Sequence, residues 1–280
     1  MKRRKYFYFL ISLWLFIPVI SDAQDKDRTL EYARQMMLEG HAGEAVEAYR
    51  RVLYFFPELT DSIARETGHA YRLSQNQEKA RYYYNLAFHN EKIPSVKTDL
   101  TFDIIHTYIL ERDYLKARLQ LINLKHAGLP MDSKKHAFYS GVVFFQTDNY
   151  QKAREAFNIY FGQQDTLFIN HIIKEAEKSF EKKPRKAMIM SIIVPGLGQA
   201  YVNEYTEAAN SFIINSAFLS LYFYVALTYN PIQGFIAVLP WFQRYYIGGI
   251  KKARTLAEET QQIRKDELLK KILEHSTNVN

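Results

Sequence analysis

Residues 43–57 read GEAVEAYRRVLYFFP, and this stretch decides the fold that the sequence predicts. It places a small residue at Ala45, an aromatic residue at Tyr49, a shorter apolar residue at Val52 and a closing proline at Pro57. The same register, a small residue followed by a large apolar one, recurs three times along the chain. The anchor alanines are 35, 37 and 36 residues apart: Ala45, Ala80, Ala117 and Ala153. A period of this length is typical of helical repeats.

Each repeat predicts a pair of antiparallel helices. A small side chain at the anchor lets the two helices approach, and the large side chain four positions later fills the space beside it. One such pair cannot bury its own apolar face, so three or more pairs must stack. The sequence therefore predicts an all-α domain over residues 24–165, built from about four repeats. A generic helical bundle is the alternative.

The register of residues 26–165 resembles that of the tetratricopeptide repeat family, which uses a small, an aromatic and a second small residue before a closing proline. The family's usual tryptophan position holds Thr29, Ala64, Thr101 and Ala137. The resemblance implies a right-handed solenoid of helical hairpins. It also implies a concave groove that binds peptides and is lined by the first helix of each hairpin.

Carried over by register, the groove positions mix cationic and aromatic residues, which would suit an extended segment carrying a carboxylate. The asparagines of the family's carboxylate clamp are absent at the matching positions. Contacts of these side chains with solvent or with the protein's own membrane region are an equal alternative. The residues implied for the groove are Arg34, Arg65, His69, Arg72, Phe102, His106 and Phe138.

Residues 1–23 have the three parts of a secretory signal peptide. A basic stretch (Lys2–Lys5) precedes an apolar stretch (Tyr6–Ile20), and Ser21-Asp22-Ala23 supplies the small residues of a cleavage site. An uncleaved anchor helix is the alternative. Either way the basic end stays inside, so we expect the chain from residue 24 onward to be exported.

Residues 166–186 predict a capping and linker helix, and residues 187–250 predict a membrane region. Between Ala187 and Ile250 the only charged residues are Glu204, Glu207 and Arg244. The stretch 187–201 would be about 22 Å long as a helix, shorter than the roughly 30 Å hydrocarbon core. The stretch 208–228 is the best spanning candidate, and 231–249 is interrupted by proline and arginine. A buried soluble hairpin is the alternative for the whole region.

The first of these stretches contains the motif PGLGQAY, which resembles a P-G-x-G-Q-x-Y motif of small bacterial membrane proteins whose function is mostly unknown. Glycines permit a tight bend and close helix packing, and a glutamine at membrane depth must find a polar partner. The motif marks a membrane domain and says little about activity. Its residues are Pro195, Gly196, Gly198, Gln199 and Tyr201.

Basic clusters at 182–186 and 251–254 flank the apolar region, and the cytoplasm is the preferred side for both. An odd number of membrane crossings leaves only the first cluster on the unfavourable side, so the sequence favours an odd number. Residues 251–280 predict an exposed, highly charged helical tail.

The chemistry available to the chain is limited. It has no cysteine, which excludes disulfides, thiolate zinc sites and cysteine nucleophiles. The eight histidines form no H-E-x-x-H motif, and no nucleophile elbow or phosphate loop occurs. We therefore expect no enzyme activity, no catalytic residues, no metal site and no cofactor. The net charge is +7, and the basic residues are spread along the chain with their densest clusters beside apolar segments, which favours a membrane border over nucleic acid.

These features predict a non-enzymatic scaffold for protein–protein interaction in a bacterial cell envelope, attached to a membrane with its repeats exported to the periplasm. The expected partners are envelope proteins or peptides and membrane lipid, without nucleic acid. The alternative is an accessory protein of membrane transport or insertion, whose membrane helices carry the activity. A transporter usually needs several ionisable groups at mid-membrane depth, and this region has only Arg244 inside an apolar stretch.

Overall fold

The computed structural model describes residues 25–179 and 183–279, and every regular element within them is helical. The predicted signal peptide, residues 1–23, lies outside the described residues. Two 3₁₀ turns (Pro57–Leu59 and Gln163–Asp165) accompany the α-helices. The α-helices are α2 (Lys26–Leu38), α3 (Ala42–Phe55), α4 (Thr60–Leu73), α5 (Gln77–Asn90), α6 (Pro94–Leu110), α7 (Tyr114–His126), α8 (Ser133–Gln146), α9 (Tyr150–Phe161), α10 (Thr166–Ser179), α11 (Pro184–Ile193), α12 (Leu197–Tyr201), α13 (Tyr205–Thr228) and α14 (Pro231–Val279). The prediction of an all-α fold is confirmed.

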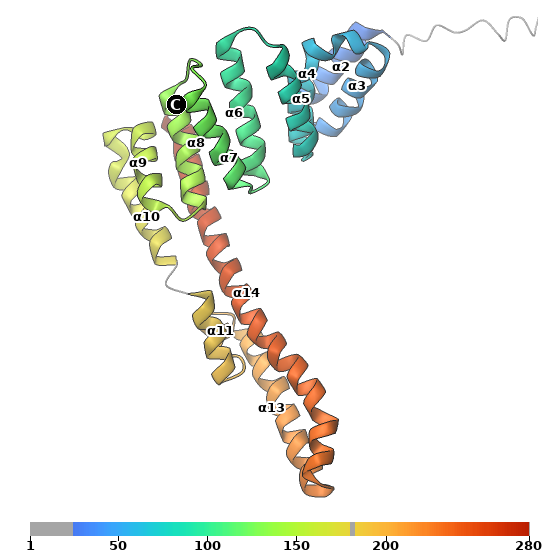
Figure 1. Cartoon of the computed structure of the whole chain (residues 1–280), viewed down its shortest axis with the longest axis vertical. Helices are drawn as coiled ribbons and strands as arrows, with labels where there is room; N and C mark the ends of the chain where they lie inside the picture. Colours follow the sequence, from blue (N-terminus) through green and yellow to red (C-terminus); the bar gives the residue numbers. More distant parts are fainter. Residues whose placement is uncertain (1–24, 180–182, 280) are drawn as a thin grey trace, which may run out of the picture. The chain divides into compact units, whose positions relative to one another are not determined.

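The chain divides into two compact units, and the boundary falls inside α8, between Tyr139 and Ser140. The first unit holds α2 to α7 and the start of α8. The second holds the rest of α8 and everything that follows, including the apolar region. Figure 1 shows the order of the helices in each unit.

The same type of turn joins the two helices in each of four successive pairs: α2–α3, α4–α5, α6–α7 and α8–α9. In each turn one residue has a positive φ, and the next residue's N–H donates to the carbonyl five positions earlier, as from Asn76 to Tyr71 at 2.9 Å. Side-chain oxygens then cap α5, α7 and α9, because Asn76, Asp113 and Asn149 each accept from the backbone N–H three residues ahead. The positive-φ residues recur at the intervals of the anchor alanines: Gly40, Gln75, Arg112 and Asp148.

The anchor alanines and the large side chains four positions later form the core of these helix pairs. All four alanines are fully buried, and Tyr84 and Phe157 are fully buried beside them. A Cβ added to Gly68 of α4 would lie 2.7 Å from the Tyr84 ring, and one added to Gly141 of α8 would lie 2.6 Å from the Phe157 ring. The glycine of the first helix thus makes room for the aromatic ring of the second.

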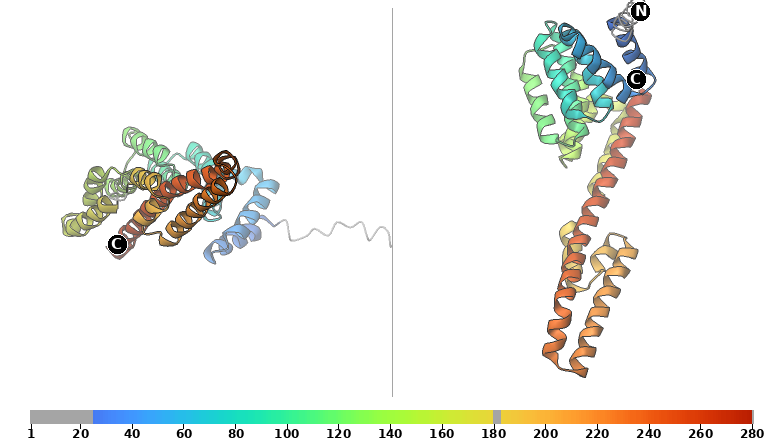
Figure 2. Two further views of the ribbon diagram at one scale, coloured as in Figure 1. Left: turned by 90° about the horizontal axis from the view of Figure 1, so that it is seen from below. Right: turned by 90° about the vertical axis from the view of Figure 1, so that its right-hand side faces the viewer.

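In the second unit, α13 and α14 run side by side as a hairpin that turns at Tyr229 and Asn230 (Figures 1 and 2). Within the described residues, α13 is the one helix long and apolar enough to cross a membrane. Asn215 is the only buried residue of α13, and several of its large apolar side chains, such as Phe212, Ile213 and Leu227, are exposed. α11 and α12 are too short to cross, since the chain bends between Val194 and Gly196.

The prediction of an exposed tail is wrong for one face of α14. This helix continues without a break to Val279, and its last turns pack against α10. Leu268 and Ile272 are fully buried, and Lys265 is 7 % exposed. The Lys265 ammonium donates to Asp148 at 2.7 Å and to the Gln146 carbonyl at 3.3 Å, and His275 lies 2.9 Å from Asp165.

These contacts also correct the expected topology. Residues 262–276 touch residues 146–175, so the two segments lie in one compartment. If the apolar region between them crosses a membrane, these contacts require an even number of crossings, in contrast to the odd number favoured by the charge distribution. The predicted linker helix 166–186 is also divided, because Pro184 begins a new helix.

Candidate functional site

Arg34, the first of the predicted groove residues, is already engaged. Its guanidinium donates twice to the Glu66 carboxylate of α4, at 2.8 and 2.9 Å. Glu66 also accepts from the Tyr49 hydroxyl at 3.0 Å, and the arginine holds the pKa of this carboxyl below its usual range. A bidentate pair of this kind leaves Arg34 little capacity for a partner's carboxylate.

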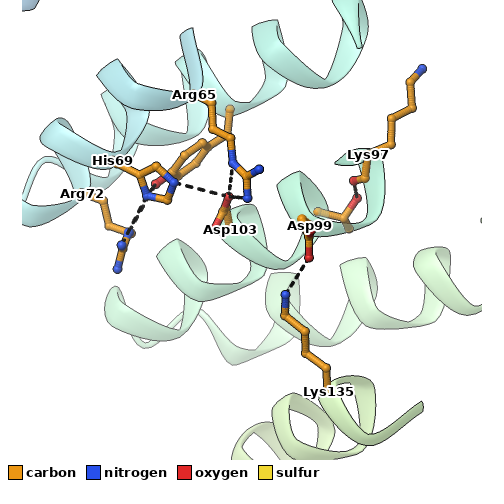
Figure 3. A network of polar contacts seen from close by, with 9 residues as sticks. Arg65, His69, Arg72, Lys97, Asp99, Asp103 and Lys135 are labelled. Atoms are coloured by element: carbon orange, nitrogen blue, oxygen red, sulfur yellow. Dashed lines mark hydrogen bonds and ion pairs between the residues drawn. The ribbon is translucent and has the colours of Figure 1, made fainter. Parts of the chain in front are cut away.

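Arg65, His69 and Arg72 lie on one face of α4, because their spacings of four and three residues match the helical period. Arg65 donates to Asp103 of α6 through Nε at 3.2 Å and through Nη2 at 3.1 Å (Figure 3). The same carboxylate lies 3.9 Å from His69 Nε2. Asp103 therefore neutralises Arg65 and faces the imidazole.

Arg72 and His69 meet the phenol of Tyr84, which α5 contributes from within the core. The Tyr84 hydroxyl lies 3.0 Å from His69 Nδ1, and Arg72 Nε donates to the Tyr84 oxygen at 3.2 Å. Burial raises the pKa of Tyr84 to about 12 and lowers the pKa of His69. The phenol and the imidazole are therefore both uncharged near pH 7.

The aromatic members of the predicted groove gather around Tyr139 of α8, which the sequence analysis did not select. Phe102 stacks on Tyr139 with 5.2 Å between the ring centres. His106 and Phe138 approach the Tyr139 ring edge-on, with 6.3 and 5.9 Å between ring centres. Phe102 is 1 % exposed, so this side chain belongs to the core and cannot meet a partner. Burial, followed by the charge of Arg72, lowers the pKa of His106.

The acidic residues of this region are the main feature that the sequence analysis missed. Glu66 and Asp103 neutralise two of the three predicted arginines, and Asp99 binds Lys135 at 2.7 Å. Each pair joins successive first helices of the hairpins, at separations of 32, 38 and 36 residues. A search for acids about one repeat away from each base would have found them.

Arg72 differs from Arg34 and Arg65. Its described contacts are to the uncharged Tyr84 and His69, and no described carboxylate lies within ion-pair distance of it. With Arg65 balanced by Asp103, the cluster keeps one net positive charge. The cluster of Arg72, His69, His106 and Tyr139, called the α4–α6 cluster below, can therefore receive one negative charge through hydrogen-bond donors.

The α4–α6 cluster predicts a pH dependence of stability. His69 and His106 have lowered pKa values in the fold, so the unfolded chain binds their protons first as the pH falls. Their contribution is present above the unfolded value of about 6.5 and is lost as the pH falls through the folded pKa. We expect the protection factors of the α4–α6 amides, measured relative to the intrinsic exchange rate at each pH, to decrease as the pH falls below about 6.5. His106→Asn should reduce this decrease, and His89→Asn, which alters an exposed ring, should leave it unchanged.

The PGLGQAY motif forms a second polar site, in the second unit. Gln199 is 1 % exposed, and both ends of its amide form hydrogen bonds: Nε2 donates to the Gly249 carbonyl at 2.9 Å, and Oε1 accepts from Ser191 Oγ at 2.9 Å. The Ser191 oxygen in turn accepts from Gly198 N at 3.1 Å. This network ties α11, α12 and α14 together.

The glycines of the motif are required by close backbone contact. Gly196 has φ +92°, and a Cβ there would collide with the Ala208 carbonyl of α13. A Cβ at Gly198 would collide with the Ala187 carbonyl of α11. Pro195 is half-buried beside this bend, and the Lys186 ammonium lies 5.0 Å from the centre of the Tyr201 ring. The motif therefore packs helices together and supplies no reactive group.

In the parts of the chain that the structure describes, no three His, Asp or Glu side chains come together as a metal site. The fold and the two sites define an all-helical protein with one helix able to cross a membrane and a cationic, aromatic cluster in its first unit. Residues 180–278 match a family of unknown function (DUF5683), and the matched segment spans the helices from α11 to α14. Comparison with the curated proteins and with the solved structures gave no match.

Proposed function

We propose that the chain is a non-enzymatic, membrane-attached scaffold of a bacterial cell envelope that binds peptides or other proteins. In this proposal the helix pairs from α2 to α9 are tetratricopeptide-like repeats of a right-handed solenoid. Their first helices form the binding face, residues 1–23 export the chain, and α13 with α14 anchors it.

The ladder of ion pairs between first helices supports the repeat interpretation. Arg34 of α2 binds Glu66 of α4, Arg65 of α4 binds Asp103 of α6, and Asp99 of α6 binds Lys135 of α8. Side chains can bridge two helices only when the helices are neighbours, so first helices of successive pairs lie next to one another. Stacked hairpins with this order are the architecture of a helical solenoid.

The single observation that carries the binding proposal is the unbalanced charge of Arg72 in the α4–α6 cluster. A guanidinium beside neutral imidazole and phenol groups is suited to a carboxylate, which accepts from several donors at once. The ligand that fits best is an extended peptide whose carboxylate, at the C-terminus or on an acidic side chain, reaches Arg72. Arg34 and Arg65 serve mainly to hold neighbouring helices together.

Peptides with a free C-terminus, compared with the same peptides amidated, test this proposal on the full chain. We expect the free forms to bind more tightly by about tenfold, because a charge-assisted hydrogen bond contributes about 1.5–3 kcal/mol. Arg72→Glu should abolish this preference. Arg51→Glu makes the same charge change on an exposed site of α3 and should preserve it.

Binding by fluorescence anisotropy over a panel of such peptide pairs gives the measurement. Equal affinity of free and amidated peptides throughout the panel, or an unchanged preference in Arg72→Glu, would remove the α4–α6 cluster from the proposal. The membrane anchor would be untouched by either result, since it depends on other residues.

A role in transport or insertion is the second function that the sequence predicts. The apolar region contains few ionisable groups that could support such a role. Between Ala208 and Ile250, Arg244 is the only Asp, Glu, Lys or Arg residue. Arg244 is about 10 Å along the helix from Lys251, near enough for its side chain to reach toward the same polar boundary. A proton or ion path needs several such groups in series.

A further inference from the structure

We propose that the base of the α13–α14 hairpin is a docking surface for anionic phospholipid headgroups, on the same bilayer face that holds α9, α10 and the end of α14. This inference rests on the proposed membrane attachment and is independent of the peptide site. The base is defined by the cations Lys183, Arg185, Lys186, Lys251, Lys252 and Arg254, and is called the basic collar below.

The fold brings the two halves of the basic collar together from distant parts of the sequence. Ala187 of α11 and Ala253 and Ala257 of α14 are fully buried in one apolar cluster. Gln199 binds the Gly249 carbonyl, and Lys252 binds Glu207 in the first turn of α13 at 2.6 Å. The cations at 183–186 and at 251–254 therefore lie at one end of the hairpin, where both of its arms begin.

The two arms of the hairpin have matched lengths, although Arg244 makes the α14 arm less apolar than α13. At 1.5 Å per residue, 208–228 in α13 and 231–250 in α14 each correspond to about 30 Å, the thickness of a bilayer's hydrocarbon core. Both arms end at charged residues, Glu207 on one and Lys251 on the other. When the arms fill the core, the collar lies in the headgroup layer of one face and Tyr229 reaches the other face.

The charge of the basic collar is not balanced by the protein. Lys252 pairs with Glu207, and Arg254 pairs with Glu258 at 2.8 Å. The remaining collar cations are exposed and have no carboxylate within ion-pair distance among the described residues: Lys183, Arg185, Lys186 and Lys251. Glu204 is the one acid of the 187–250 segment besides Glu207. A surplus of exposed cations at the headgroup layer is complementary to anionic lipid.

Apolar side chains adjoin the basic collar, which favours lipid over a soluble acidic partner. Ile192 and Ile193 near the end of α11 and Leu197 at the start of α12 are exposed. On α13 the exposed apolar side chains continue to Leu227, which is 86 % exposed. A ring of cations bordering an apolar band of bilayer thickness matches a headgroup and its acyl chains, whereas an acidic protein would leave the band uncovered.

Lipid binding by the full chain in a neutral detergent tests the proposal, with phosphatidylglycerol and phosphatidylcholine of equal chain length as the probes. We expect at least about tenfold tighter binding of phosphatidylglycerol at low salt, decreasing as ionic strength rises, since each collar cation contributes about fivefold.

Neutralising Lys183, Arg185, Lys186 and Lys251 to Gln should reduce phosphatidylglycerol binding to the phosphatidylcholine level. A matched variant changes four exposed lysines outside the collar to Gln and should retain the preference: Lys134, Lys174, Lys178 and Lys270. Equal binding of the two lipids, or an undiminished preference in the collar variant, would overturn the proposal.

The absence of cysteine allows a direct test of sidedness. Single cysteines at Gln164 and Glu267, both exposed in the second unit, should react with an impermeant maleimide from the same side of sealed membrane vesicles. A cysteine at Tyr229 should react from the opposite side. Reaction of positions 164 and 267 from opposite sides, or of position 229 from their side, would contradict the shared bilayer face. The peptide preference of Arg72 is measured in detergent, so its failure would not be confused with failure here.

Discussion

Replacing Gly198 by Ala is expected to destabilise the packing of α11, α12 and α14 by about 1–3 kcal/mol or more. The added methyl group collides with the Ala187 backbone carbonyl, which cannot rotate away as a side chain can. It also crowds the Ser191 hydroxyl, whose oxygen accepts from the Gly198 N–H and whose O–H donates to Gln199 Oε1. Thermal unfolding of the full chain in detergent, followed through the fluorescence of Trp241 on α14, measures the loss.

Gly248→Ala is the matched control for this prediction. The site is in α14, one residue from the Gln199 partner Gly249, and a Cβ there meets no other atom within 4 Å. Alanine is also a better helix former than glycine by about 1 kcal/mol, so this variant should be as stable as the parent or slightly more stable. Equal stability of the Gly198 and Gly248 variants would show that α11 and α12 do not pack on α14 as described.

The second large effect is expected at the end of α14. Leu268→Ala and Ile272→Ala each remove a fully buried side chain and leave a cavity. Each change should lower the free energy of unfolding by about 2–5 kcal/mol. Because this segment packs on α10, either change should release the tail and accelerate its cleavage by added protease. Limited proteolysis and chemical unfolding of the full chain provide the two measurements.

Leu273→Ala is the control on the same turn of the helix. Leu273 is 41 % exposed, so truncating its side chain should change the free energy of unfolding by less than about 1 kcal/mol. Should all three variants unfold alike, the tail would be the exposed charged helix that the sequence predicted, and the shared compartment of α10 and α14 would lose its support.

The periodic residues were predictable because each acts through neighbours a few positions away. Ala45, Ala80, Ala117 and Ala153 were selected by their shared repeat register, and all four are fully buried. The caps at Asn76, Asp113 and Asn149 follow from the same local chemistry, since a short polar side chain satisfies free N–H groups at a helix start.

The state of each predicted groove residue could not be predicted in this way. Register placed Arg34, Arg65 and Arg72 on equivalent helices, yet only Arg72 keeps an unbalanced charge. Phe102 was expected to line an open groove, and it is buried beneath Tyr139 and Lys135. Which acid reaches which base depends on the stacking of helices about one repeat apart.

The tail was misjudged for a related reason. Residues 251–280 carry many charges, and only Leu268, Leu269 and Ile272 form an apolar patch. The sequence gives no sign that Lys265 would be buried, because its charge is matched by Asp148 and the Gln146 carbonyl, more than a hundred residues earlier. Burial of a lysine depends on partners that only the fold supplies.

From the sequence alone follow the helical class, the period of the anchor residues, the apolar region and the bend at the PGLGQAY motif. The tertiary structure alone decided which cations are neutralised, that the tail docks on α10, and that two basic clusters far apart in the chain form one collar. Periodicity, capping and apolar length are properties of a few adjacent residues. Charge pairing and burial depend on distances between helices, which packing sets.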